Sequence, residues 1–546
     1  MPSLPRFTAR PLPVLLAAAA ALAAIWLASP GDTRRALANS LELAAGAMLI
    51  ALPLGTLLAI LIARFDLPGR AAAAAGLVVL LFLPLYVHLC GWEAAAGRIG
   101  WLTLNYGSMA QPLLAGMRGA IVVHGLAAVP WVALIVGLGL SQIDAAQEEA
   151  GLLVLPPAGV LGRITLPQCL PFLVAAAIWT VVSTTSEMTV TNIFLMNATR
   201  EKFERTYTEQ FYSKFSLTAD AGEATLAAMP GVLGLIVILL LALWMVAQLG
   251  RRRNLSRPRG SVTFSAGAWR LLAAAVLWLI VLALLAVPIA ALVNKAGFVV
   301  LHDGEQRIRS WSLLAALREL AAAPLRFGVD FSWTLRVAAA AASVATLLGV
   351  ALAWPARRGG RRSWPAIAAV VLGLAIPGPL VGVALIQLFN HDLPPRLAWG
   401  DGYKSWLLIL YDNSPLAPIL AQAIRALPLA TLIAWHSLAT LSDDVLGAAA
   451  LDGLSPWRVF WKIALRQRWR AIAAAWLAAL AVAAGDLAWV HLVTPPGMDL
   501  IQRRVFGLVH SGVEEQVAAI ALVNIAFYSL LAAAILWLLR PRRSFR

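Results

Sequence analysis

The sequence predicts an all-α polytopic membrane protein with about twelve transmembrane helices, arranged as two halves of six helices each. Three observations lead to this fold class. The chain has 546 residues, of which 61% are hydrophobic and only 13% charged, whereas soluble chains are about half apolar and a quarter charged. Apolar stretches long enough to cross a bilayer recur along the whole chain. Segments of the first half also reappear in the second half.

Twelve apolar stretches come close to the roughly 20 residues that an α-helix needs to span a bilayer. They lie at 12–28, 39–63, 70–90, 116–140, 168–192, 224–248, 268–293, 332–355, 364–389, 416–438, 468–492 and 516–539. The first stretch follows Arg6 and Arg10 and precedes small residues, so it could also be a cleaved signal peptide. The corresponding stretch at 268–293 favours a retained helix.

Basic residues indicate the orientation of the helices. RRRNLSRPRG (251–260), ARRGGRR (356–362) and RPRRSFR (540–546) are short, strongly basic segments. Because such segments stay on the cytoplasmic side of the membrane, we expect both termini to be cytoplasmic. The formal net charge of +16 is therefore a property of the inner loops and gives no reason to expect nucleic acid as a partner.

Internal similarity divides the chain into two predicted domains. NSLELAAGAMLIALPLG (39–55) resembles WTLRVAAAAASVATLLG (333–349), and in each segment a glycine follows a hydroxyl residue by fifteen positions. The segment 249–267 is polar, basic and interrupted by Pro and Gly, as linkers are. We therefore expect a first half at 1–248 and a second half at 268–546.

The strongest repeat is a pair of polar loops, each between the fourth and fifth helix of its half. EEAGLLVLPPAGVLGRITLP (148–167) aligns with GAAALDGLSPWRVFWKIALR (447–466) at an offset of 299 residues. Acidic and alanine-rich residues start a helix well, and a glycine permits a sharp reversal. The first copy has Val154 where the second has Gly453, so we expect it to turn at Pro156 and Pro157 instead.

Together the two copies resemble the EAA loop of permease subunits in binding-protein-dependent type I ABC importers. The resemblance implies that the loops, at about 144–167 and 443–466, form short coupling helices that dock into a groove on a cytoplasmic ATPase. The residues that match the motif are Glu148, Glu149, Ala150, Leu166 and Pro167 in the first copy, and Ala448, Ala449, Asp452, Gly453 and Leu465 in the second. The alternative is an amphipathic connector that lies on the membrane surface.

The same resemblance implies partners and a location. They are two copies of an ABC ATPase, an external substrate-binding protein, and a bacterial inner membrane that the chain crosses many times. ATP would be bound by the partner ATPase, so this chain needs no cofactor of its own. Its sequence contains no Walker A loop, HExxH, CxxC or Gly-x-Ser-x-Gly motif, so it signals no enzymatic chemistry. Cys90 and Cys169 give neither a disulfide framework nor a metal site.

Two segments bear on the substrate. SEMTVTNIFLMN (186–197) and GDLAWVHLVTPPGMDLIQRRVFGLVHSGVEEQVAA (485–519) are similar to the ferric-iron branch of that family. Ferric iron is therefore the expected substrate. Thiamine, 2-aminoethylphosphonate and polyamine are the alternatives, since related branches carry them.

Polar residues in the apolar stretches are candidates for the translocation pathway. Glu187 and Asp486 lie 299 residues apart, near the ends of equivalent helices, and His88 and His124 lie in or beside apolar runs. They could attract a cation, or they could face water or pack inside the protein. Intramembrane charges also occur in proton- or sodium-coupled secondary transporters, which form the alternative class.

Overall fold

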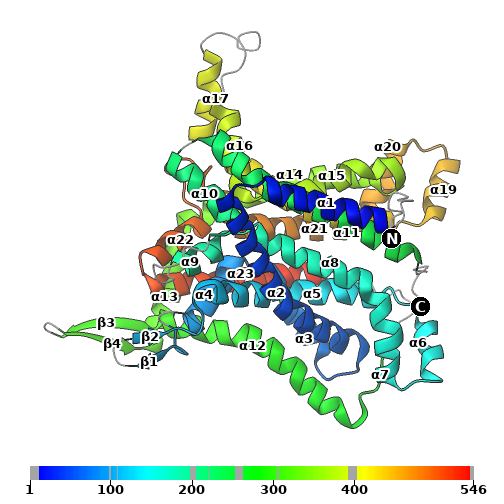
Figure 1. Ribbon diagram of the computed structural model, residues 1–546, viewed down its shortest axis with the longest axis horizontal. Coiled ribbons are helices and arrows are strands. Elements are labelled where there is room, and N and C mark those ends of the chain that lie inside the picture. The colour runs from blue at the N-terminus through cyan, green and yellow to red at the C-terminus, as the bar shows by residue number, and fades with distance from the viewer. Residues whose placement is uncertain are drawn as a thin grey trace. The chain divides into compact units, whose positions relative to one another are not determined.

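A computed structural model describes residues 11–97, 100–106, 109–196, 205–218, 220–252, 262–303, 306–390 and 402–540. These residues form two compact units. The amino-terminal unit contains residues 11–328 and 504–527, and the carboxyl-terminal unit contains residues 329–503 and 528–540. Figure 1 labels most of the elements of the two units.

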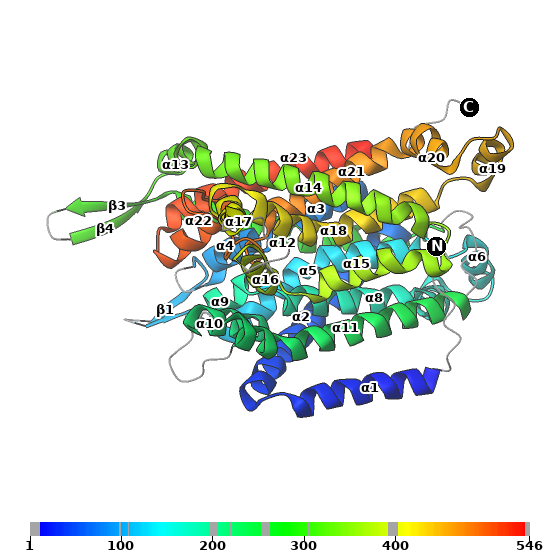
Figure 2. The same cartoon turned by 90° about the horizontal axis from the view of Figure 1, so that it is seen from above.

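Helices dominate the amino-terminal unit. Its elements are α1 (Pro11–Ala28), α2 (Gly31–Arg64), α3 (Arg70–Phe82), α4 (Leu85–Ala96), β1 (Leu104–Tyr106), β2 (Met109–Gln111), α5 (Gly116–Leu140), α6 (Ala145–Leu152), α7 (Pro157–Val160), the π-helix η1 (Leu161–Thr165), α8 (Leu166–Thr185), α9 (Thr189–Met196), α10 (Tyr207–Thr218), α11 (Ala221–Arg252), the 3-10 helix η2 (Gly267–Trp269), α12 (Arg270–Ala296), β3 (Phe298–Asp303), β4 (Gln306–Trp311) and α13 (Leu313–Arg326). The helices α2, α5 and α8 pack against one another, and α1 packs along α11 (Figure 2).

The strands form two antiparallel hairpins within the described residues. Leu104 of β1 pairs with Gln111 of β2, and Phe298 of β3 pairs with Trp311 of β4. Both hairpins connect helices, so the fold remains all-α in character.

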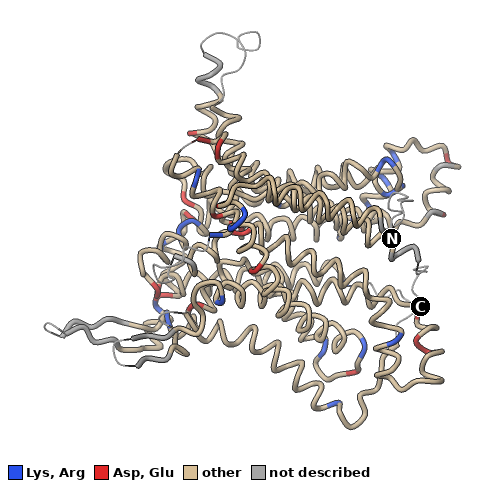
Figure 3. Tube along the Cα trace, in the orientation of Figure 1, with Lys and Arg blue, Asp and Glu red and all other residues tan. Residues whose placement is uncertain are grey.

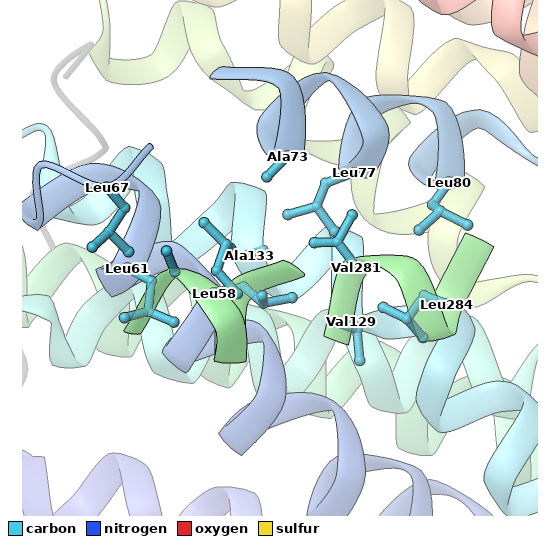
Figure 4. Close-up of a cluster of buried hydrophobic side chains, with 12 residues drawn as sticks. Leu58, Leu61, Leu67, Ala73, Leu77, Leu80, Val129, Ala133, Val281 and Leu284 are labelled. Atoms are coloured by element: carbon cyan, nitrogen blue, oxygen red, sulfur yellow. The ribbon is translucent and has the colours of Figure 1, made fainter. Parts of the chain in front are cut away.

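A buried apolar cluster joins four helices of this unit. Leu58 and Leu61 of α2, Leu77 of α3, Val129 of α5 and Val281 of α12 are members. Leu77 points toward Val281, as Figure 4 shows. Helix α12 therefore packs on α3. The sequence places the start of the second half at residue 268 and so assigns α12 to that half. This assignment stays a prediction.

The carboxyl-terminal unit contains a similar series of helices. Its elements are α14 (Gly328–Ala356), the 3-10 helix η3 (Gly360–Ser363), α15 (Trp364–Ala375), α16 (Gly378–Asn390), α17 (Gly402–Asn413), α18 (Leu416–Ala439), α19 (Asp443–Leu451), α20 (Pro456–Val459), the π-helix η4 (Phe460–Ala464) and α21 (Leu465–Gly485). Helices α22 (Ile501–His510) and α23 (Glu514–Leu539) follow, and the boundary between the units falls within each of them. Helix α18 packs against both α15 and α21.

The predicted all-α polytopic membrane fold is confirmed. Eight helices in the described part of the chain are long and apolar enough to cross a membrane, or up to ten if each of two bent helix pairs is one span. Lys and Arg lie mostly near helix ends, and the long helices are largely free of charge along their length (Figure 3). Two of the twelve predicted spans fall outside this set: the described part of α1 is shorter, and α21 carries Arg466, Arg468 and Arg470 near its start.

Two predicted spans, 70–90 and 364–389, are wrong as single straight helices. The chain bends by 105° between α3 and α4 and by 104° between α15 and α16. In both places the residue before a proline, Leu83 or Ile376, is extended. A proline disfavours the helical conformation at the preceding residue and removes a backbone donor, so each of these prolines favours a helix end at that place.

Two other predicted spans, 168–192 and 468–492, end early. Helix α8 ends at Thr185 and helix α21 ends at Gly485. An acidic residue follows each end, Glu187 in one case and Asp486 in the other. The hydropathy of the sequence continues past these residues, which is why the sequence predicted longer helices.

A hydroxyl contact recurs 294 residues apart. The backbone N–H of Tyr207, the first residue of α10, donates to Ser40 Oγ at 3.0 Å. The N–H of Ile501, the first residue of α22, donates to Thr334 Oγ1 at 2.8 Å. The first N–H groups of a helix have no partner inside that helix, so each hydroxyl fixes a short helix to a long one.

Close helix packing also recurs, at the glycines of the sequence repeat. A Cβ atom at Gly55 of α2 would lie 2.5 Å from Cβ of Val132 in α5, and one at Gly349 of α14 would lie 2.9 Å from the backbone nitrogen of Thr431 in α18. Small residues allow the backbones of membrane helices to approach closely. The glycines therefore set the separation of α2 from α5 and of α14 from α18.

We expect Gly55→Ala to destabilise the protein by about 1–3 kcal/mol, the usual cost of overpacking a filled interface. Gly137→Ala is the matched control, because a Cβ there meets nothing within 4 Å. Thermal unfolding in detergent, followed by tryptophan fluorescence, measures both variants. Equal midpoints for the two variants would contradict the packing role of Gly55.

Candidate functional site

The first polar loop is built from two short helices and a turn. Asp144 caps α6, since its side chain accepts a hydrogen bond from the N–H of Ala146 at 3.3 Å. The chain then turns at 153–156, and α7 begins with Pro157 at its first position, where a proline is favoured because its missing donor is not needed. The turn thus includes the first residue of the proline pair, Pro156, near the place that the sequence predicted.

The second polar loop repeats this construction. Helices α20 and η4 begin 299 residues after α7 and η1, at Pro456 and Phe460. Ser455 caps α20 by accepting a hydrogen bond from the N–H of Arg458 at 3.4 Å. Gly453 has φ of +71°, in the left-handed region that favours glycine. Gly453 therefore lies in the turn of the second loop, as the sequence predicted.

Each loop exposes large apolar side chains at its turn. Leu153 and Val154 are 87% and 84% exposed in the first loop, and Leu451 is 91% exposed in the second. Trp457 and Trp461 of the second loop are 67% and 51% exposed, and their rings lie 5.4 Å apart. Contiguous exposed apolar residues on a polar loop are typical of a surface that binds another protein.

The residues that match the EAA motif differ widely in exposure. Those that are exposed are Glu149, Ala150, Pro167, Ala448, Asp452 and Gly453; Leu166 and Leu465 are partly buried, and Glu148 and Ala449 are buried. The loops thus place several motif residues at the surface. The interior positions of Glu148 and Ala449 instead serve the packing of α6 and α19.

Glu148 lies in a buried ion pair that sequence reasoning missed. Its Oε2 lies 3.2 Å from an Nη atom of Arg64, and the two side chains are 0% and 1% exposed. Thr165 of η1 donates to Glu148 Oε1 at 2.7 Å. Burial raises the pKa of the Glu148 carboxyl, while the hydrogen bond from Thr165 and the charge of Arg64 act in the opposite direction.

A first polar cluster lies beyond the end of α8, about 30 Å along the helix from the first loop. Glu187 accepts hydrogen bonds from the backbone N–H groups of Thr189 at 2.6 Å and Val190 at 3.0 Å, so it caps α9. Its Oε2 lies 3.7 Å from Nε2 of His124, whose side chain is only 2% exposed. The structure therefore brings together two of the predicted pathway residues, Glu187 and His124.

Glu209 of α10 belongs to the same cluster and was not predicted. It is 4% exposed and accepts a hydrogen bond from the Asn192 side chain at 3.3 Å. Burial raises its pKa to about 7; Arg205 and the hydrogen bonds lower it, and the charge of Glu187 raises it further. Its position in a polar helix gave no sequence signal of burial.

A second polar cluster lies at the end of α21. Asp486 accepts a hydrogen bond from the N–H of Ala488 at 3.1 Å, as Glu187 does from Thr189. The Asp486 carboxylate also lies 2.7 Å from Nε of Arg425, and Gln422 donates to the Asp486 carbonyl at 2.9 Å. Each of the two predicted acids thus accepts backbone hydrogen bonds just beyond the end of a helix. Each also lies close to a side chain of the preceding long helix, His124 in the first cluster and Arg425 in the second.

His88 is not part of either cluster. It is buried in α4, and its Nε2 lies 3.3 Å from the carbonyl oxygen of Leu80. This is the packed, hydrogen-bonded arrangement that was the alternative to a pathway role. In the described ranges, no group of three or more His, Cys, Asp or Glu side chains is placed to hold a metal ion.

A family model matches the second part of the chain. Residues 345–542 match the family described as binding-protein-dependent transport system inner membrane component. The chain is 28% identical over 190 residues to the putrescine transport system permease protein PotI of Escherichia coli, covering 34% of this chain and 64% of the relative. It is 29% identical over 136 residues to a probable sulfate transport system permease protein, cysT, of Marchantia polymorpha, covering 24% of this chain and 45% of the relative. The chain thus spans less than two thirds of the length of these relatives.

Glu209 predicts a pH-dependent stability. A carboxyl whose pKa is raised in the folded state binds more protons than in the unfolded state, so the free energy of unfolding falls as pH rises from about 4.5 to about 7. This group should lower the stability by about 3 kcal/mol across that window. Glu209→Gln should remove the effect in thermal unfolding measured from about pH 5 to about pH 8. The control is Glu223→Gln, since Glu223 is 57% exposed; an unchanged pH profile for Glu209→Gln would refute the burial argument.

Proposed function

We propose that this chain, whose residues 345–542 match the permease family of binding-protein-dependent importers, forms both halves of the membrane pathway of an ATP-driven ABC importer. The observation that carries the proposal is the repeated loop. The same order of helix, turn, short helix and π-helix occurs in both loops, and the short helices and π-helices begin at a constant offset of 299 residues. Each copy exposes large apolar residues at its turn, which supports a docking role.

The loops at 144–167 and 443–466 are the proposed contacts with two copies of a cytoplasmic ATPase. Leu153, Val154, Leu451 and Trp457 offer apolar surface that a protein groove can cover. ATP binding would bring the two ATPases together and displace the loops. Because α8 and α21 continue directly from the π-helices that end the loops, this displacement would reach the membrane helices and change which side of the pathway is open. In this mechanism the chain is a translocation subunit and not an enzyme.

Orientation follows from the loops. A cytoplasmic ATPase requires that both loops face the cytoplasm, which agrees with the basic segments 251–260, 356–362 and 540–546 and with cytoplasmic termini. The two polar clusters then lie toward the external side, where a substrate-binding protein would deliver its cargo. The segments 196–223 and 294–331 are the proposed external contacts; parts of both lie outside the described residues.

Ferric iron is the proposed substrate, on the resemblance of 186–197 and 485–519 to that branch. The first polar cluster supports a cation, because Glu187 and Glu209 lie near each other with one histidine. In the second cluster Asp486 is paired with Arg425 and adds no net charge. Polyamine is the next candidate, since one relative is named for putrescine, and thiamine or 2-aminoethylphosphonate follow. Another relative is named for sulfate; if this chain carried sulfate, its pathway would have to tolerate an anion.

We expect Gly453→Val to reduce uptake by about tenfold or more while the protein stays in the membrane. A branched side chain at a left-handed position costs roughly 1–2 kcal/mol, and relief of that strain would turn α20 away from its docking position. Gly447→Ala is the control, since a Cβ at Gly447 meets nothing within 4 Å. Normal uptake by Gly453→Val, at equal abundance in the membrane, would rule out the coupling role of this turn.

The energy source separates the proposal from secondary transport, which intramembrane charges such as Glu187 would also suit. Uptake of radiolabelled ferric iron in whole cells should stop when ATP is depleted and should persist for minutes after a protonophore is added. Competition by excess putrescine, thiamine or 2-aminoethylphosphonate identifies the substrate among the alternatives. Uptake that survives ATP depletion and collapses with the protonophore would favour a secondary transporter.

A further inference from the structure

The two loops are anchored to their units in different ways. In the first loop, the side chains of Arg64 and Glu148 form an ion pair that is almost completely excluded from solvent. At the position of Glu148 the second loop has Gly447, which lacks a side chain. Gly447 therefore cannot form the equivalent of this ion pair.

The ion pair connects four segments of the amino-terminal unit. Arg64 is the last residue of α2, and an Nη atom donates to the carbonyl oxygen of Leu140, the last residue of α5, at 2.8 Å. Glu148 belongs to α6 and accepts a hydrogen bond from Thr165 of η1. The pair thus holds α6 against the ends of α2 and α5 and against the start of α8.

The segment before α12 closes over the same arginine. The N–H of Phe264 donates to the carbonyl oxygen of Arg64 at 2.7 Å, and Arg64 donates to the carbonyl oxygen of Val262 at 3.4 Å. The rings of Phe65 and Phe264 lie 5.9 Å apart, edge to face. The described end of the predicted linker therefore covers the ion pair and helps to exclude water from it.

The second loop is held by aromatic packing at a different place. The ring of Phe460 in η4 lies 5.0 Å from that of Trp354 in α14, and the guanidinium of Arg357 lies 3.8 Å above Trp354. These contacts fix the π-helix and do not involve α19. In α19, Ala449 is buried, but Gly447 and Ala448 are exposed. In α6, both Ala145 and Glu148 are buried, and Glu148 carries a charge.

From these contacts we infer that Arg64 and Glu148 are positioning residues that hold α6 as a rigid docking element, whereas α19 adapts to its ATPase. Glu148 does not touch the ATPase, because its side chain is fully buried; the exposed residues of the turn do. The inference rests on the proposed function for its role in coupling, but the anchoring itself does not depend on the identity of the partner.

Amide hydrogen exchange of the whole protein in lipid nanodiscs tests the anchoring. In the parent protein, 145–152 should exchange more slowly than 443–451. Glu148→Gln should accelerate exchange in 145–152 by about tenfold or more, because a buried charge that loses its partner is strongly destabilising. The segment 443–451 should not change. Glu149→Gln is the matched control for exchange, since it removes a neighbouring but exposed carboxylate from the same helix.

A double variant and a conservative variant separate positioning from a general loss of folding. Arg64→Met combined with Glu148→Leu should restore slow exchange in 145–152, because apolar side chains of similar volume can replace a buried ion pair. Arg64→Lys, with Glu148 unchanged, should keep slow exchange only in part, because an ammonium cannot reproduce the fork of donors that reaches two carbonyl oxygens. The ratio of ATP hydrolysed to substrate taken up, with the cognate ATPase, should rise in Glu148→Gln and return toward the parent value in the double variant.

Equal exchange in Glu148→Gln and Glu149→Gln would overturn the inference, as would fast exchange in the double variant. Accelerated exchange in Glu148→Gln together with an unchanged coupling ratio would overturn the positioning role. Uptake by the parent protein that needs no ATP would instead remove the proposed function and leave the exchange results standing. The two failures are therefore distinguishable.

Discussion

Where a helix ends inside a membrane protein, the segment that begins after it has backbone N–H groups that water cannot reach, and the rest of this fold depends on how they are satisfied. Carboxylates perform this task after α8 and α21, where Glu187 and Asp486 accept backbone hydrogen bonds. Hydroxyls do so at α10 and α22, where Ser40 and Thr334 accept them. Because these contacts recur at nearly constant offsets, the polar residues that the sequence places in apolar segments serve first to terminate helices, and any role in transport is added to that one.

Hydropathy predicted where the long helices lie, but it could not predict where they bend. Pro130 and Pro428 lie inside the continuous helices α5 and α18, whereas Pro84 and Pro377 lie at bends of about 105°. The residue type is the same in all four cases. Whether a helix continues through a proline depends on the packing of its neighbours, which a single sequence does not contain.

The two loops could be predicted because they occur twice, and the glycine turn at Gly453 followed from residue type. The burial of Glu148 could not be predicted. Its partner Arg64 is far away in the sequence, at the end of an apolar stretch, where a lone arginine is equally typical of a membrane boundary. Glu209 was missed for a related reason, since its burial depends on the packing of α10 on α2 and α11. Local patterns thus identified the surface of the site, and long-range pairs determined its interior.

The central claim is that two structurally matched loops bind an ATPase, and photo-crosslinking in intact cells tests it most directly. A photoreactive amino acid at Leu153 and, separately, at Trp457 places the probe on the exposed turn of each loop. The account predicts that both positions crosslink to the same cytoplasmic protein, that this protein contains a Walker A sequence, and that a probe at Leu217 of α10, which is 78% exposed, does not. Crosslinks from Leu153 and Trp457 to lipid alone, or to a protein without an ATP-binding motif, would contradict it.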